Sequence, residues 1–430
     1  MPQTLLTVFE DRQKKMSLSP SQAEDILSFR SVFGENSISL SCEGHLHVRH
    51  FVGFISKGKT RLQILPKIYE NIGLEEDEER RESMRVMLNL LRVSEFNKVL
   101  ALPDQSSCAE QSDIMEIFIA IFADKVFHIY SRQMNREYIS ISENSAYVKG
   151  RIDFSTNLRE NPIRKDMHIV NFQSFEHDNL INNIVKTVCF KLIRLTGSSE
   201  NKKNLKKALV LLNDAQEIAL SKDLFDAVKF TRLNMPFKPV FEMAKMFFLN
   251  LTPQSYQGDD TICSFLIPLN ELFEYYLYKL FNAFGEGTTA SYQNQNIHCF
   301  ARGCDNDYHV TLRPDIILNV GKYPKLIADA KYKNPKYQNG LYTNISQSDM
   351  YQVFAYARIY GVKCVALIYP QFENTYTPSM RVELGDSDEK VHLIIGCIDI
   401  KNADIQKSSM DLRNMLSIDL EIIGGVACEG

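Results

Sequence analysis

Short apolar runs in the last third of the chain predict strands that lie side by side. Residues 316–318 form one run and residues 326–328 form the next. The segment 321–324 between them reads Gly-Lys-Tyr-Pro, which is typical of a turn joining neighbouring strands. A third run, within residues 363–370, ends in proline and predicts a buried strand.

Helical periodicity precedes and follows these strands. Residues 269–281 carry leucine and phenylalanine at the spacing of one helical face. Residues 349–357 again predict a helix, on which Gln352 and Tyr356 lie four residues apart on one face. The expected order is therefore helix, strand, strand, helix and strand.

The first 250 residues predict a β-rich region followed by a helical one. Strands are expected at residues 37–40, 45–55 and 60–68, with a hairpin loop at residues 56–59. Helices are expected from the acidic run 75–81 onward and at residues 113–134, 180–195, 203–212 and 236–249. A chain of 430 residues is long enough for several cores, so the expected fold class is α/β multidomain. The expected parts are an N-terminal β-rich module over residues 1–110, a helical connector over 111–255, and an α/β domain over 256–430.

Two acidic residues stand at the ends of the apolar runs, which is an unusual environment for a carboxylate. Asp315 directly precedes the first run, and Asp329 follows the second as part of Asp329-Ala330-Lys331. Side chains alternate along a strand, so Asp329 and Lys331 point the same way. The turn brings Asp315 alongside from the neighbouring strand. Two carboxylates and one amine are therefore expected to share a small cavity, which suits Mg²⁺.

This grouping predicts phosphodiester hydrolysis. A bound metal lowers the pKa of a water and neutralises charge on the phosphate, while Lys331 orients that water or helps to deprotonate it. The alternative is a buried ion pair of Asp329 or Asp315 with Lys331. Burying two acids and one base seldom stabilises a fold, so this alternative leaves the cluster without a clear purpose.

Four more residues are candidates around this cavity. Glu274, on the first helix, is either a further metal ligand or an exposed helical glutamate. Gln352 and Tyr356 either line a DNA groove or, for Tyr356, contribute an aromatic ring to the core. Lys333 belongs to a local group of lysines that makes the surroundings basic.

The order of elements resembles the restriction-endonuclease-like PD-(D/E)xK nuclease fold, including the glutamine-x-x-x-tyrosine helix of its RecB-like branch. More of the chain is similar to the McrC family, the nuclease subunit of McrBC-type restriction systems. The matching segments are residues 62–68, 148–154, 178–183, 272–274, 313–315 and 329–332.

This resemblance implies a magnesium-dependent DNA endonuclease that cuts double-stranded DNA containing modified cytosine of the 5-methylcytosine type, with Mn²⁺ able to substitute. Asp315, Asp329 and Glu274 would bind the metal and Lys331 would assist the water. It also implies that the N-terminal module binds a McrB-like hexameric AAA+ GTPase. That partner would bind GTP and recognise the modified base, and this chain would stimulate its GTP hydrolysis.

Charge and hydropathy narrow the functional classes further. Lysine and arginine number 49 and aspartate and glutamate 53, so the net charge is −4. A protein that grips DNA unaided is usually basic, so this balance favours DNA delivery by a partner. The most apolar helix, near residues 114–130, contains Glu116, Asp124 and Lys125, which indicates a core helix. No signal peptide is evident, and we expect a cytoplasmic protein without a membrane partner.

Two rival functions remain open from the sequence. One is a stand-alone RecB-like repair nuclease, which would cut without GTP. The other is a non-catalytic subunit that activates the NTPase of a partner and carries a vestigial site. The presence of Asp315, Asp329 and Lys331 argues against a vestigial site.

Overall fold

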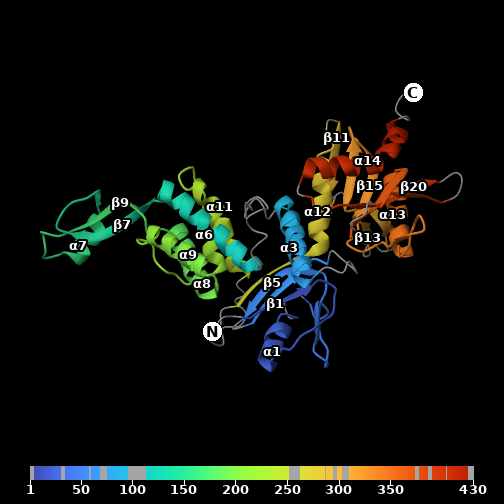
Figure 1. The fold of residues 1–430 in the computed structure, drawn as a ribbon. Helices are drawn as coiled ribbons and strands as arrows, with labels where there is room; N and C mark the ends of the chain where they lie inside the picture. The colour runs from blue at the N-terminus through green and yellow to red at the C-terminus, as the bar shows by residue number, and fades with distance from the viewer. Residues whose placement is uncertain are drawn as a thin grey trace.

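The computed structural model describes residues 4–30, 34–57, 60–67, 75–94, 113–250, 262–285, 287–293, 298–302, 309–372, 377–385, 390–402 and 404–424. These residues form a mixed α/β structure of several sheets, as expected (Figure 1). No helix among them is both long and apolar enough to cross a membrane.

The N-terminal module is built on a four-stranded sheet of order β1-β6-β5-β10. Its strands are β1 (Thr4–Phe9), β6 (Thr60–Leu65), β5 (Phe51–Lys57) and β10 (Ile262–Pro268). Strand β1 runs parallel to β6, whereas β5 pairs antiparallel with both β6 and β10. A second sheet and a helix cover this sheet through the cluster around Val8, Ile26 and Leu46. They comprise β2 (Lys14–Lys15), β4 (His45–Val48), β3 (Ile38–Leu40) and α1 (Pro20–Ser28).

The single strand predicted over residues 45–55 is wrong, because the chain turns in its middle. His50 lies between β4 and β5 and has a φ of 67°, in the left-handed region that interrupts a strand. Its backbone N–H donates to Glu10 Oε1 at 3.2 Å. The turn sends β4 and β5 into different sheets.

Residues 53–60 also have the GxxxxGK[ST] spacing of a phosphate-binding loop, but their structure does not fit one. A P-loop joins a strand to a helix, and its glycine-rich loop surrounds the phosphates. Here β5 pairs antiparallel with β6 up to Lys57 and Thr60, so a strand follows in place of a helix. Gly58 and Lys59 lie outside the described residues. The motif therefore gives no support for nucleotide binding by this segment.

The middle of the chain is a helical bundle with a projecting β arm. The helices are α6 (Ile114–Arg132), α8 (Leu180–Leu195), α9 (Ser199–Leu211), α10 (Lys222–Ala227) and α11 (Lys238–Asn250), with the 3-10 turn η1 (Met235–Phe237). The arm comprises β7 (Glu137–Ser145), β8 (Arg151–Ile152), α7 (Phe154–Glu160) and β9 (His168–Glu176). Figure 1 shows it extending away from the bundle. Helices α6, α8, α9 and α11 agree with the prediction, whereas our sequence analysis predicted neither α10 nor any strands for the arm.

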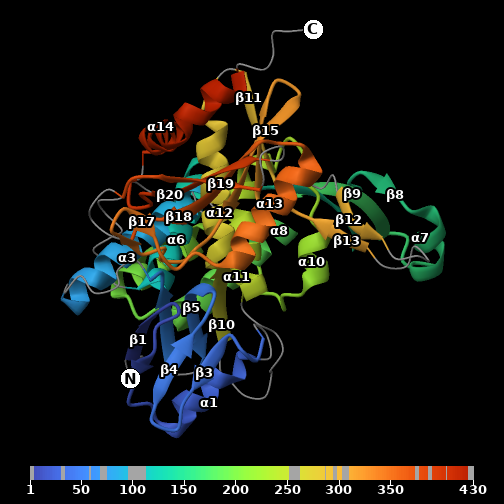
Figure 2. The same cartoon turned by 90° about the vertical axis from the view of Figure 1, so that its right-hand side faces the viewer.

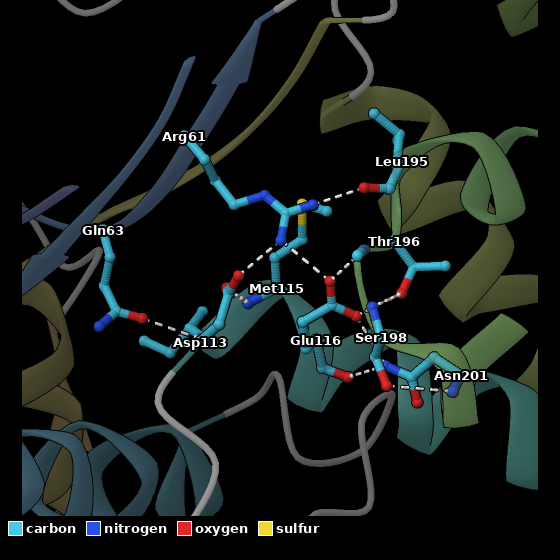
Figure 3. Close-up of polar contacts among 11 residues, drawn as sticks. Arg61, Gln63, Asp113, Met115, Glu116, Leu195, Thr196, Ser198 and Asn201 are labelled. Carbon is cyan, nitrogen blue, oxygen red and sulfur yellow. Dashed lines mark hydrogen bonds and ion pairs between the residues drawn. The ribbon is translucent and has the colours of Figure 1, made fainter. Parts of the chain in front are cut away.

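A buried charge cluster connects the N-terminal sheet to the bundle (Figure 3). Arg61 on β6 lies 2.7 Å from Asp113 and 2.9 Å from Glu116 of α6. Its guanidinium also donates to the carbonyl of Leu195, at the end of α8. The Glu116 carboxylate accepts from Gly197 N at 2.7 Å and Asn201 Nδ2 at 2.8 Å.

The C-terminal domain contains a six-stranded sheet of order β11-β14-β15-β18-β20-β19 (Figure 2). The strands are β11 (Thr288–Tyr292), β14 (Ile316–Val320), β15 (Tyr323–Ala330), β18 (Cys364–Pro370), β20 (Val391–Ile398) and β19 (Met380–Leu384). Two hairpins flank it, β12 (His298–Arg302) with β13 (His309–Leu312) and β16 (Tyr337–Gln338) with β17 (Leu341–Tyr342). Strands β15, β18 and β20 run parallel, and the remaining neighbours pair antiparallel.

Helices cover both faces of this sheet, as the alternation of its strands requires. Ile316 and Ala328 share a core with α12 (Leu269–Asn282) and α14 (Ile405–Gly424) on one face. Ile317 and Ile327 share a core with α13 (Gln347–Tyr360) on the other. The predicted order of helix, strand, strand, helix and strand is thereby present as α12, β14, β15, α13 and β18.

The N-terminal module and the C-terminal domain are continuous through one strand and one helix. Strand β10 belongs to the N-terminal sheet, and α12 begins at the next residue. Helix α12 also packs beside α3 (Glu76–Val93), as Figure 1 shows. The expected boundary between the connector and the α/β domain, at residues 255 and 256, lies outside the described residues, and the division into three domains stays a prediction.

Candidate functional site

Two neighbouring strands bring Asp315 and Asp329 together at one edge of the C-terminal sheet. Strand β14 pairs antiparallel with β15, and the pair Ile316 with Ala328 places Asp315 beside Asp329. Asp315 Oδ2 accepts a hydrogen bond of 2.8 Å from the backbone N–H of Ala330. Gly321, with a φ of 62°, forms the turn that the Gly-Lys-Tyr-Pro segment predicts. This edge contains the carboxyl ends of parallel strands, where open α/β sheets commonly bind ligands.

Lys331 lies on the same side as Asp329, as the strand alternation predicts. Its Nζ is 2.6 Å from Asp329 Oδ2, and Asp329 is only 1% exposed. The two atoms form a buried ion pair, in which Lys331 is the partner of Asp329 Oδ2. A buried ion pair costs desolvation and is weak evidence for a purely stabilising role.

Helix α13 supplies the polar residues that hold Lys331. Lys331 Nζ donates to Gln352 Oε1 at 3.0 Å, and Gln352 Nε2 donates to the Tyr356 hydroxyl at 2.8 Å. That hydroxyl donates to the carbonyl of Arg313 at 3.2 Å. Tyr356 is 3% exposed, so its ring belongs to the core while its hydroxyl supports the site. In this arrangement Gln352 and Tyr356 orient Lys331.

Glu274 approaches the cluster from α12 and is fixed by a glutamine. Gln293, which follows β11, donates from Nε2 to Glu274 Oε2 at 2.9 Å. The Arg313 side chain donates to the amide oxygen of Gln293. The backbone N–H of Gln293 donates to the carbonyl of Asp315 at 2.9 Å, so this residue joins Glu274 to the strand of Asp315.

Lys333 lies farther out and pairs with a residue that our sequence analysis did not select. Its Nζ is 3.1 Å from Asp349 Oδ2, and Asp349 Oδ1 lies 3.8 Å from Lys331 Nζ. The side chain of Lys333 is 54% exposed, whereas that of Asp349 is 9% exposed. Asp349 therefore links the exposed lysine to the buried one.

Gln293 and Asp349 are the two site residues that the sequence reasoning missed. Asp349 stands in the first turn of a predicted helix, where an acid is commonplace. Its spacing of three residues before Gln352 was the only available signal. Gln293 follows a strand that our sequence analysis did not predict, so no pattern in the sequence pointed to it.

Burial dominates the electrostatics of the site, and repulsion among its carboxylates adds to the effect. Burial raises the pKa of Asp315 to about 8, and the charges of Asp329 and Glu274 add to this rise. Burial likewise raises the pKa of Asp329 and of Glu274 above their ordinary values. For Lys331, burial lowers the pKa, but nearby carboxylates, Asp329 first, outweigh it and raise the value. The folded state thus disfavours the charged form of these carboxyl groups, a form that a nearby cation would favour.

The donor set fits a hard divalent cation. Magnesium takes carboxylate oxygens, and Asp315 and Asp329 supply oxygens of that kind from neighbouring strands. Among the described residues, no three His, Cys, Asp or Glu side chains form a ready-made metal cluster. Asp315 and Asp329 are therefore the pair best placed to hold a cation, and a direct contact from Glu274 stays a prediction.

Comparisons with known proteins agree with this architecture. The family model described as McrBC 5-methylcytosine restriction system component matches residues 46–370. No curated protein matches the chain. A chain of the solved half-complex of the Thermococcus gammatolerans McrB AAA+ hexamers with bound McrC is 21% identical, with a TM-score of 0.77. That match covers 96% of this chain and 100% of the other. A second match, in the Thermococcus gammatolerans McrBC complex, has 22% identity and a TM-score of 0.49 over 63% of this chain and 85% of that one.

Proposed function

Because the chain belongs to the family of McrBC 5-methylcytosine restriction system components, we propose that it is the DNA endonuclease subunit of such a system. It hydrolyses phosphodiester bonds of double-stranded DNA that contains modified cytosine, in a magnesium-dependent reaction. Its C-terminal domain is a PD-(D/E)xK nuclease domain. The cluster of Asp315, Asp329, Lys331 and Glu274 is its active site.

The gathering of Asp315, Asp329 and Glu274 around Lys331 is the observation that carries this proposal. A carboxylate 1% exposed, beside a second acid whose pKa rises to about 8, is unfavourable unless a cation compensates it. The ammonium of Lys331 balances only one of the three nearby carboxylates. A purely structural ion pair would not need Asp315 and Glu274 at the same place.

Asp315 and Asp329 would hold Mg²⁺, with Glu274 completing or supporting the site. The ion would supply Lewis-acid activation of a water and charge neutralisation at the phosphate. Lys331 is held by Gln352 and Asp329, and its raised pKa keeps it an ammonium at neutral pH. This charge suits orienting the water and stabilising the anionic phosphate better than removing a proton.

The partner of this subunit is a McrB-like AAA+ hexamer that binds GTP. Support comes from the similar solved structure, whose description places McrC on McrB AAA+ hexamers. The net charge of −4 also favours DNA delivered by a partner. The N-terminal module of this chain would bind the hexamer and stimulate its GTP hydrolysis.

The test is cleavage of methylated and unmethylated plasmid by this chain with its co-purified partner. Each reaction contains Mg²⁺, with or without GTP, and compares wild type with Asp329→Asn. The matched control is Glu383→Gln, an acid of the same sheet whose side chain is 53% exposed. We expect cleavage that requires methylation, GTP and Asp329, with Glu383→Gln cutting like wild type.

Two other results would replace this proposal. Cleavage without GTP would indicate a stand-alone nuclease. Stimulated GTP hydrolysis without cleavage under any condition would indicate a non-catalytic activating subunit.

A further inference from the structure

Tyr332, the residue after Lys331, leaves the C-terminal sheet and reaches the N-terminal module. Its hydroxyl donates to the carbonyl of Lys67 at 3.2 Å, across 265 positions of sequence. Lys67 lies two residues beyond the end of β6. Burial raises the pKa of Tyr332 well above its ordinary value, and the Glu10 charge adds to the rise. Tyr332 is thus partly buried, and its hydroxyl lies where the two parts of the molecule meet.

The ring of Tyr332 packs against residues adjoining the proposed active site. Its centroid is 5.6 Å from that of Phe273, with the ring planes at 83°. A second edge-to-face contact joins it to Phe372, at 5.8 Å and 79°. Phe273 directly precedes Glu274 on α12. One aromatic ring thus touches the helix of Glu274 while its own backbone continues from Lys331.

The helix that bears Glu274 is anchored on the same end of the N-terminal sheet. Strand β10 pairs with β5, and the first residue of α12, Leu269, donates its backbone N–H to the carbonyl of His50 at 2.9 Å. Strands β1, β6 and β10 all end here, and β5 begins here. Lys331 directly precedes Tyr332, and Glu274 lies on the helix that begins at Leu269. Both residues are therefore close in sequence to a contact with this sheet end.

The backbone of Lys331 is held from two sides. Its N–H donates to the carbonyl of Ile368 on β18 at 2.9 Å, which fixes it to the C-terminal sheet. Tyr332 fixes the next residue to Lys67. The pairing of β14 with β15 ends at Ile316 with Ala328 and therefore does not reach Lys331. The tyrosine contact thus supplies a second restraint where the strand pairing ends.

We propose that Tyr332 is a positioning residue, which sets Lys331 relative to Glu274 by anchoring both to the N-terminal module. This inference rests on the proposed nuclease function of the same site. A contact of this kind also transmits displacement: a movement of the β6 end relative to the C-terminal sheet would move Lys331. The module that is expected to bind the partner is thereby connected directly to the proposed catalytic lysine.

The test uses the full chain in complex with its partner and compares Tyr332→Phe with Tyr276→Phe. Tyr276, on α12, also donates its hydroxyl to a backbone carbonyl, that of Asp399 at 3.3 Å, but within the C-terminal domain. Tyr332→Phe keeps the ring and removes only the bond to Lys67. We expect its kcat for DNA cleavage to fall about tenfold at unchanged KM, since one net hydrogen bond corresponds to roughly that factor. Tyr332→Leu, which also removes the ring contacts, should lose more.

GTPase stimulation and thermal unfolding separate positioning from general stability. Both should stay near wild type in Tyr332→Phe, and Tyr276→Phe should cut at nearly the wild-type rate. Equal cleavage by wild type and Tyr332→Phe would overturn the inference, as would a parallel loss of cleavage, GTPase stimulation and melting temperature. Asp329→Asn is included because full cleavage by that variant would instead overturn the proposed active site itself.

Discussion

Two buried clusters of charged residues in this protein have similar composition but differ in how far their carboxylate charges are compensated. The cluster of Arg61, Asp113 and Glu116 joins the N-terminal sheet to the helical bundle (Figure 3). The cluster of Lys331, Asp329 and Asp315 lies at the edge of the C-terminal sheet. Each places two acids near one base in a largely buried environment.

The first cluster is almost fully satisfied. Burial raises the pKa of Glu116, but hydrogen bonds from Thr196, Asn201, Gly197 and Arg61 outweigh it and lower the value overall. Asp113 accepts from both Arg61 and the N–H of Met115, although burial keeps its pKa raised. Only Arg61 Nε lacks a hydrogen bond there. Such an arrangement needs no further ligand.

The second cluster has fewer donors for its carboxylates. Asp315, Asp329 and Glu274 all have raised pKa values, and the buried Asp329 Oδ2 is paired with Lys331 Nζ. The comparison teaches that burial and ion pairing alone do not identify an active site. The informative difference is carboxylate charge that the protein leaves uncompensated, which a cation from solution can compensate.

The largest expected effect is on catalysis. Asp329→Asn should reduce cleavage by about 1000-fold or more, because a metal ion contributes several kcal/mol to the transition state. Its melting temperature should equal or exceed that of wild type, since the change removes repulsion with Asp315 and Glu274. Plasmid cleavage and scanning calorimetry measure the two effects. A strongly lowered melting temperature would instead indicate that Asp329 forms a structural ion pair.

The opposite result is expected for the first cluster. Arg61→Leu leaves Asp113 and Glu116 buried without their cation, which should destabilise the fold by about 3–5 kcal/mol. Cleavage per folded molecule should change little, because the cluster contributes nothing to the chemistry. Thermal unfolding and active-fraction titration would check this. An inactive variant that unfolds like wild type would contradict it.

Metal binding should stabilise only the molecule with an intact second cluster. At about 100 times the dissociation constant, Mg²⁺ should add about 2.7 kcal/mol to wild-type stability and nothing to Asp315→Asn. Asp315 must lose its proton to bind Mg²⁺, and its pKa is raised to about 8. The increase in melting temperature caused by Mg²⁺ should therefore grow between pH 6 and 9. Melting curves with and without Mg²⁺ at several pH values provide the test. A pH-independent shift would argue against Asp315 as a ligand.

Glu10 belongs to neither cluster, and its variant should show the smallest effect. Burial raises its pKa from 4.5 to about 7. The unfolded carboxyl therefore loses its proton first, so the folded state loses stability as pH rises from about 4.5 to about 7. Glu10→Gln keeps an oxygen for the N–H of His50 and should raise the melting temperature above pH 7, with little change near pH 4.5. An increase of equal size at both pH values would contradict the assignment.

Sequence patterns predicted five C-terminal elements, α12, β14, β15, α13 and β18, because burial there is regular. They did not predict β11, β19, β20 or α14 of the same domain. The runs around Ile317, Ile327 and Val365 alternate between the two helical layers, so apolar spacing and strand position coincide. The same alternation placed Asp329 and Lys331 on one side. Gln352 and Tyr356 were identified because residues four apart lie on the same face of a helix.

Other features depend on contacts that sequence spacing does not encode. In the arm, β7 has no buried residue, so no core-facing run marks it as a strand. The break at His50 requires a positive φ, which the apolar pattern on either side of it does not encode. Gln293 and Tyr332 act through partners on other elements, and Lys67 contacts Tyr332 only after folding.

Manganese binding is the most direct test of the central claim that the second cluster is an uncompensated metal site. Electron paramagnetic resonance counts free Mn²⁺ in the presence of wild type, Asp329→Asn, and Glu116→Gln as a buried carboxylate control from the first cluster. The account predicts saturable binding by wild type and Glu116→Gln and its loss in Asp329→Asn. Equal binding by all three variants, or no binding by wild type, would contradict it.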